Sequence, residues 1–135
     1  MHTDKLLKPS LALMLAISLL ECGDSGKGEF SEQQICKATV AKVMGRNPLI
    51  IKIDKISGNV THLSYIRKDD GKHWAYKCKL EGATVIWASD TGRWRTDKYD
   101  PKITFSVNKQ KLSISEKYSD GSGDEKLYSL QQLGS

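Results

Sequence analysis

The regular alternation of apolar and polar residues from Leu49 onward constrains the fold of this chain more than any other feature. In the clearest stretch every second side chain is large and apolar: Trp74, Tyr76, Cys78 and Leu80. The positions between them hold His73, Ala75, Lys77 and Lys79. Side chains on a β-strand point alternately to the two faces of a sheet, so this period predicts a strand with one buried face.

The same period continues along the chain and is interrupted at short intervals by turn residues. Groups rich in glycine, asparagine, aspartate and serine occur at 57–59, 69–71, 81–82, 108–110 and 119–124. A longer polar connection runs from about Ser89 to Pro101. Half-buried strands joined by short turns are typical of an antiparallel meander, and we expect about six strands in sequential order.

A single helix is predicted ahead of these strands. Ser31 and Gln34 have the spacing of a capping box, and Gly45 and Pro48 follow Met44, where the helix is expected to end. Its apolar face would carry Ile35, Cys36, Val40, Val43 and Met44, and its other side Gln34, Lys37, Ala38, Ala41 and Lys42. The sequence therefore predicts an α+β fold in which the helix packs on one face of the sheet.

The first 22 residues have the composition of an export signal rather than of a folded domain. Lys5 and Lys8 precede about ten uncharged apolar residues, 11–20, and Cys22 follows. This order resembles the signal peptide of a bacterial prolipoprotein, although Glu21 stands where Gly, Ala or Ser is usual. The resemblance implies a protein exported to the periplasm or cell envelope and anchored to a membrane by a lipid on Cys22. Two alternatives remain, a cleaved signal of a soluble secreted protein and an apolar N-terminal helix of a cytosolic protein.

Between this signal and the helix, residues 23–30 contain three glycines and almost no apolar side chain. Such a composition is typical of a flexible tether. The remaining segment, 31–133, is long enough for one modest hydrophobic core and too short for two. We therefore expect a single α+β domain over 31–133.

The chain contains three cysteines, an odd number that needs an explanation in an exported protein. Lipidation of Cys22 would leave Cys36 and Cys78 as a pair. One lies on the apolar face of the predicted helix and the other on the buried face of a predicted strand. We expect a disulfide between them, as an oxidising periplasm allows, with two buried free thiols as the alternative. Because no cysteine or histidine has the spacing of a zinc site, no metal is expected.

Basic residues outnumber acidic ones by 21 to 16, which gives a net charge of +5. A cationic domain can bind nucleic acid, anionic lipid or an acidic protein surface. Export would keep the protein away from nucleic acid, so we expect no partner of that kind. The lysines are spread over every segment rather than clustered, which is also typical of a solvated surface.

The most suggestive functional segment is Arg93-Trp94-Arg95, within the polar connection after Ser89. Arginine and tryptophan dominate the binding energy of protein interfaces, and loops carry binding residues more often than strands. We therefore predict a partner-binding site at these three residues. The alternative is that Trp94 begins another strand and is buried, with the arginines paired to Asp90, Asp97 or Asp100.

The sequence lacks the motifs of the common hydrolases and nucleotide-binding proteins, so we expect a non-enzymatic protein without catalytic residues or cofactor. Its expected role is to bind an envelope or extracellular protein. The segment Tyr76–Gly82, with Cys78 at its centre and Val85 after it, resembles the cysteine-bearing strand of membrane-bound-type periplasmic lysozyme inhibitors. That resemblance implies an alternative role, inhibition of a cell-wall hydrolase or periplasmic protease. Because the family's inhibitory serine and lysine motifs are not matched, none of its functional residues is carried over.

Overall fold

The computed structural model of this chain describes residues 26–134. The described elements are α2 (Glu32–Met44), η2 (Pro48–Ile50), β1 (Lys52–Ser57), β2 (Val60–Ile66), β3 (His73–Glu81), β4 (Thr84–Ser89), β5 (Lys102–Asn108), β6 (Lys111–Lys117), β7 (Gly123–Ser129) and α3 (Leu130–Leu133). The predicted signal with Cys22, and residues 23–25 of the predicted tether, lie outside the described residues.

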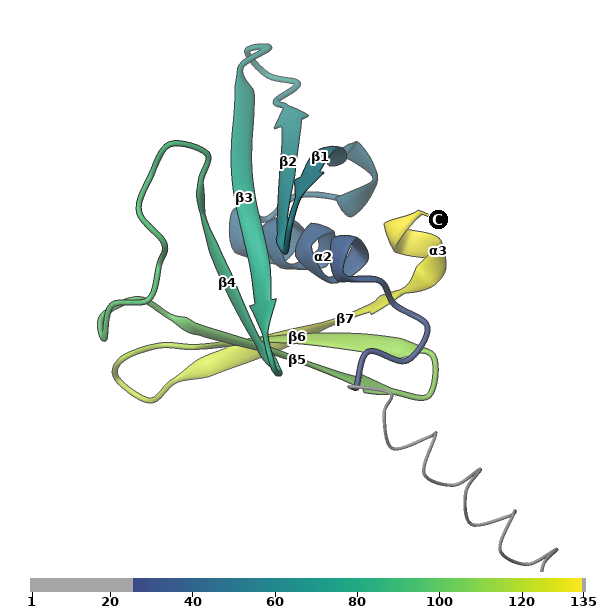
Figure 1. The fold of residues 1–135 in the computed structure, drawn as a ribbon, viewed down its shortest axis with the longest axis vertical. Coiled ribbons are helices and arrows are strands. Elements are labelled where there is room, and N and C mark those ends of the chain that lie inside the picture. The colour runs from purple at the N-terminus through teal and green to yellow at the C-terminus, as the bar shows by residue number, and fades with distance from the viewer. Residues whose placement is uncertain (1–25, 135) are drawn as a thin grey trace, which may run out of the picture.

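The seven strands form one antiparallel sheet in sequential order (Figure 1). The predicted α+β class and antiparallel meander are therefore confirmed, with seven strands in place of about six. The six predicted connections already separate seven segments, and the strands at the two edges, β1 and β7, are mostly exposed. A bulge between Ile53 and Lys55 also interrupts the pairing of β1.

The helix α2 has the ends that its sequence predicts. The Ser31 hydroxyl accepts a hydrogen bond from the backbone N–H of Gln34 at 3.1 Å, and the Gln34 side chain accepts one from the Ser31 N–H at 2.9 Å. Gly45 closes the helix in the left-handed conformation, with φ of 65°. These local contacts satisfy backbone groups that a helix terminus otherwise leaves unpaired.

The sheet bends sharply between β4 and β5. These two strands pair only at Thr84–Thr104 and Val85–Ile103, whereas β3 pairs with β4 over the whole length of β4. Beyond the two pairs the strands separate, so that β5–β7 cross below β1–β4 in Figure 1, and α2 lies between the two halves. The predicted long connection, residues 90–101, spans the resulting gap.

The helix α2 is buried on more sides than its sequence predicts. Strands from both halves of the sheet contact it, and η2 and α3 pack against it as well. Ala38 and Ala41, assigned to the side away from the core, are 0% and 1% exposed. The Lys42 side chain is only 7% exposed, and its ammonium donates to Glu116 at 2.7 Å and Asp124 at 2.6 Å. Burial opposes the charge of Lys42, but these two hydrogen bonds raise its pKa above the usual value.

The predicted disulfide between Cys36 and Cys78 is present, with Cα atoms 5.8 Å apart. It joins α2 to β3 inside the core, where both residues are fully buried. The alternative of two free thiols does not apply to this structure.

The folded region begins before Ser31. Phe30 falls within the predicted tether, 23–30, but it is 3% exposed and packs in the core. Its backbone N–H donates to the carbonyl of Lys27 at 3.0 Å, and the Lys27 ammonium lies 3.3 Å from a Glu32 carboxylate oxygen. These contacts attach residues 27–30 to the domain.

Candidate functional site

The connection between β4 and β5, which we call the 90–101 loop, stands at the side of the sheet (Figure 1). Its first half follows the edge of β4. The Gly92 N–H donates to the Ser89 carbonyl at 2.9 Å, and the Arg95 N–H donates to the Trp87 carbonyl at 3.0 Å. The loop is therefore held by backbone hydrogen bonds to the strand that precedes it.

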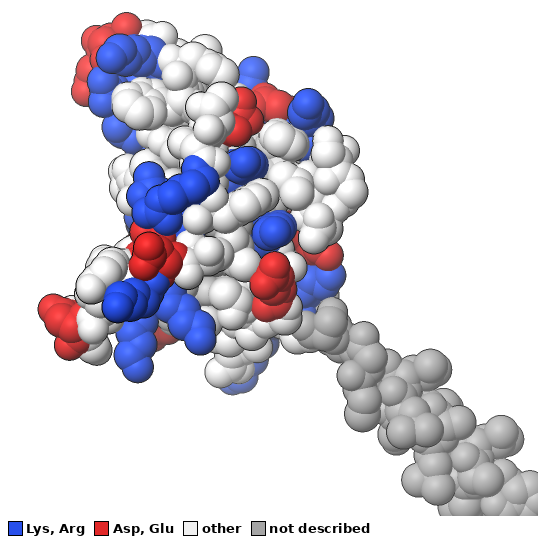
Figure 2. Space-filling view, turned by 60° about the vertical axis from the view of Figure 1, so that its left-hand side comes forward, with Lys and Arg blue, Asp and Glu red and all other residues white. Residues whose placement is uncertain are grey.

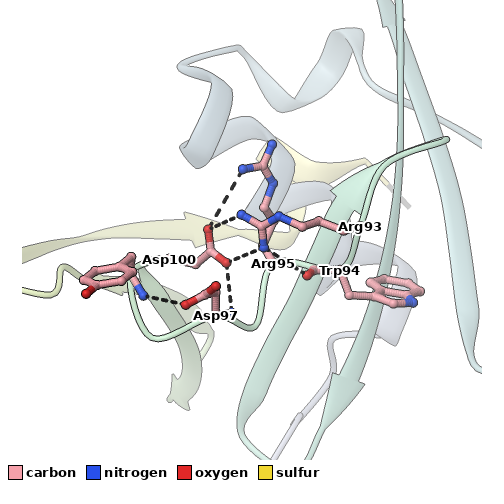
Figure 3. Close-up of polar contacts among 6 residues, drawn as sticks. Arg93, Trp94, Arg95, Asp97 and Asp100 are labelled. Atoms are coloured by element: carbon pink, nitrogen blue, oxygen red, sulfur yellow. Dashed lines mark hydrogen bonds and ion pairs between the residues drawn. The ribbon is translucent and has the colours of Figure 1, made fainter.

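Asp100 is the centre of the polar contacts in this loop (Figure 3). Arg93 donates two hydrogen bonds to its carboxylate, at 2.8 and 3.1 Å, and the Asp97 N–H donates a third at 2.9 Å. A guanidinium nitrogen of Arg95 lies 3.9 Å away. The hydrogen bond from Arg93 is the main reason that the pKa of Asp100 falls below its usual value, and the same contact raises the pKa of Arg93.

Of the three aspartates that the sequence offered to these arginines, the structure uses Asp100. The Asp90 carboxylate lies instead 3.4 Å from Nδ1 of His62. Asp97 accepts the backbone N–H of Tyr99 at 3.3 Å. Both arginines remain reachable from solvent, since the side chains of Arg93 and Arg95 are 58% and 41% exposed.

Trp94 points away from the two arginines and from Asp100 (Figure 3). Its ring centre lies 4.6 Å from the ammonium of Lys77 and 4.5 Å from that of Lys79, two neighbours on one face of β3. Cations at this distance from an indole ring attract it electrostatically. Trp94 is half-buried and belongs to no strand, so it does not begin the extra strand of the alternative interpretation.

The structure thus divides the predicted triplet between two sides of the loop. Arg93 and Arg95 share Asp100, while Trp94 lies against lysines of the sheet. Side chains that follow one another in an extended segment point in opposite directions, which accounts for this division. Figure 2 turns this side of the molecule toward the reader and shows basic side chains with acidic ones among them.

A hollow of about 310 Å³ opens where β4 and β5 separate. Its apolar lining comes from three buried residues, Val85, Ile86 and Ile103. Arg95 and the loop residues 96–98 line it too, as do 100–102. We call it the wedge. It combines an apolar floor with three basic side chains and with the carboxylates of Asp97 and Asp100, because the loop crosses the gap that the bend of the sheet leaves.

Sequence reasoning missed several residues of this site. The strand alternation predicted Lys77 and Lys79 on the polar face of their strand. No feature of the neighbouring sequence indicated that Trp94 would pack against them. Lys98 and Lys102, which line the wedge, belong to the polar connection and to the start of β5. Their position depends on how far β4 and β5 pair, which is a property of the whole sheet.

Acidification should release the 90–101 loop. The lowered pKa of Asp100 means that the stabilisation by Arg93 is present above the usual carboxylate pKa and is lost as the pH falls through the lowered value. We expect the side-chain carboxyl carbon of Asp100 to shift in NMR spectra with a midpoint below 3.8, the usual value for aspartate. Asp100→Asn should abolish this transition. A midpoint at the usual aspartate pKa in the native protein would contradict the stabilisation of the Asp100 carboxylate by Arg93.

The chain matches no protein-family model, and neither a curated protein nor a solved structure is significantly similar to it. Among residues 26–134, no helix is long and apolar enough to cross a membrane. Within the same range, no group of three or more His, Cys, Asp or Glu side chains is placed to hold a metal ion.

Proposed function

We propose that this protein is a non-enzymatic binding module of the bacterial cell envelope, tethered to a membrane through Cys22. In this proposal the 90–101 loop and the wedge capture an envelope or extracellular protein that presents an apolar side chain next to acidic residues. The observation that carries the proposal is the pairing of exposed basic side chains with an apolar hollow at one place on the surface.

The size of the wedge supports a protein partner. A hollow of about 310 Å³ is large enough for one large apolar side chain, which is how the central residue of many interfaces is bound. Around it, Arg95, Lys98 and Lys102 can meet carboxylates of the partner. Arg93 already forms a two-point contact with Asp100, and its 58% exposed side chain extends the same basic rim.

The arrangement of the loop before binding is also favourable. Asp100 accepts hydrogen bonds from Arg93 and from the Asp97 backbone, so this part of the loop has a defined shape in the free protein. A loop that is already ordered loses little conformational entropy on binding. The buried disulfide suits an exported protein, because disulfides persist in oxidising compartments.

Reversing the two loop charges tests the binding role. We expect Arg93→Glu with Arg95→Glu to lower the affinity for the captured partner by about a hundredfold, because two basic groups of the rim become acidic. The partner would be isolated from envelope extract with the immobilised native protein, identified by mass spectrometry and titrated against purified variants. Lys52→Glu with Lys111→Glu is the matched control, since it makes the same charge change at exposed positions elsewhere. Equal affinity of the two double variants would refute the assignment.

The proposed location has its own test in the intact mass of the protein purified from its native envelope. We expect a mass that begins at Cys22 and includes a lipid, and that rises by two protons on reduction. A mass that retains residues 1–21 and does not change on reduction would contradict both the tether and export. Such a result would move the domain to the cytosol and make nucleic acid the next partner to examine.

Inhibition of a cell-wall hydrolase or periplasmic protease is the second candidate. The ordered 90–101 loop favours it, because inhibitors of hydrolases commonly present a loop that changes little on binding. Titration of lysozymes and periplasmic proteases with the native protein would reveal inhibition as a loss of enzyme activity that is complete at an equimolar amount of this protein. Unchanged activity across such a panel would remove this candidate and leave simple capture.

A further inference from the structure

A second hollow, of about 470 Å³, lies between the end of α2, the turn η2 and the strand β7. Its lining includes Arg46 and Leu49 from the α2–η2 segment, and Lys126 and Tyr128 from β7. None of its lining residues lines the wedge. We call it the α2–β7 hollow.

Two of its lining residues carry buried polar atoms that have no hydrogen-bond partner. Among the side chains of residues 26–134, this holds for three atoms: Arg46 Nε, Ser64 Oγ and Tyr128 Oη. Buried polar groups in folded proteins are nearly always paired, so an unpaired one points to a missing water, ion or ligand. Two of the three therefore belong to residues that line one hollow, and both atoms are hydrogen-bond donors.

Tyr128 is suited to such a role. The residue is 1% exposed, and its ring lies 5.6 Å from the ammonium of Lys126. Burial is the main reason that the pKa of its hydroxyl is raised, so the hydroxyl stays protonated at neutral pH and remains a donor. Arg46 and Lys126 line the same hollow, and the charges of Lys42 and Glu116 also act on the hydroxyl.

The charge of the hollow favours an anion. Arg46 and Lys126 line it, and no carboxylate is among its lining residues. The nearby acidic groups on β6 and β7, Glu116 and Asp124, share the one ammonium of Lys42, at 2.7 and 2.6 Å, so these three side chains together carry one negative charge. Neither carboxylate lines the hollow, so a carboxylate or phosphate entering here would meet Arg46 and Lys126 first.

One wall of the hollow is apolar. Pro48 and Leu49 line it, and Leu49 is 63% exposed. The next residue of the same turn, Ile50, is 40% exposed. An apolar chain lying over this turn would remove these side chains from water, which is favourable. The volume is also in the range of sites that hold small organic ligands.

We propose that the α2–β7 hollow binds a small amphiphilic anion, with its carboxylate or phosphate group held by Arg46, Lys126 and Tyr128 and its apolar chain lying over Pro48 and Leu49. The site is separate from the wedge and does not depend on capture of a protein. Carboxylate and phosphate head groups share the required chemistry, so both are tested.

Calorimetric titration of the full chain with octanoate, octyl phosphate and octylamine tests the proposal, each below its micellar concentration. We expect one or both anions to bind and octylamine not to bind. Tyr128→Phe should weaken binding of the anion about tenfold, since it removes a hydrogen bond to a charged group. Because the hydroxyl is unpaired in the free protein, the same variant should unfold at an unchanged or higher temperature. Arg46→Gln should weaken binding at least as much.

Two control variants separate the site from general effects of charge or aromatic content. Arg67→Gln matches Arg46→Gln, because Arg67 lies 5.3 Å over the Trp74 ring much as Arg46 lies 5.5 Å over the Tyr65 ring. Tyr118→Phe removes a hydroxyl from an exposed tyrosine. Both controls should bind the anions like the native protein. Equal binding of octylamine, no binding of either anion, or unchanged affinity in Tyr128→Phe and Arg46→Gln would each overturn the proposal.

Discussion

Replacing Cys36 and Cys78 together by alanine should lower the free energy of unfolding by about 2–5 kcal/mol, the usual effect of removing a native disulfide from a small domain. The bond closes a long loop, because the two residues are 42 positions apart in the sequence, and it thereby restricts the unfolded chain. In the folded state it joins α2 to β3 where both residues are fully buried. Urea unfolding followed by tryptophan fluorescence measures the change.

Reduced native protein provides the control for this variant. Reduction removes the bond and leaves both thiols in place, so its unfolding midpoint should fall close to that of the double alanine variant. The native protein under oxidising conditions should unfold at a clearly higher urea concentration. Equal midpoints for oxidised and reduced native protein would show that the disulfide adds nothing to stability.

Phe30→Ala should destabilise the domain by about 3–5 kcal/mol, the range for removing a buried phenylalanine side chain. Phe30 is 3% exposed and packs in the core, although glycine-rich sequence surrounds it. The alanine variant would leave a cavity under the segment that leads into α2. Thermal or urea unfolding measures the loss, provided the disulfide is intact in both proteins.

Glu29→Ala is the matched control for Phe30→Ala, because its exposed side chain lies one position earlier in the same segment. We expect that variant to stay within about 0.5 kcal/mol of the native protein. If Phe30→Ala were equally mild, residues 27–30 would belong to the tether and the domain would begin at Ser31. A large loss places the start of the domain before Phe30.

The features that could be predicted from the sequence are those that depend on a few neighbouring residues. The capping pair Ser31 and Gln34 and the terminal Gly45 define α2 by contacts within one turn of the chain. The alternation from Trp74 to Leu80 predicts β3 in the same local way, although Trp74, expected on the buried face, is 37% exposed. The disulfide followed from these two elements, since each predicted a buried face that carries a cysteine.

The features that were missed depend on how the sheet bends. Ala38 and Ala41 are buried because both halves of the sheet and the two short helical turns, η2 and α3, surround α2. A helix that packs on one face of a flat sheet needs only one apolar side, and this is what its sequence pattern predicted. Trp94 could not be placed on Lys77 and Lys79 without knowing the course of the 90–101 loop. The wedge itself exists only because β4 and β5 separate after Val85 and Ile103.

The open meander has a consequence for the behaviour of many copies held close together. The sheet order places β1 and β7 at its two ends, where backbone groups of each strand face outward and can pair with another chain. β1 carries Lys52 and Lys55 and a bulge between Ile53 and Lys55, while β7 begins with Gly123 followed by Asp124, Glu125 and Lys126. A strand of another molecule that paired with either edge would lie beside these charged side chains. At β1 it would also meet the irregular backbone of the bulge. These features of the two edges disfavour pairing between the sheets of neighbouring copies.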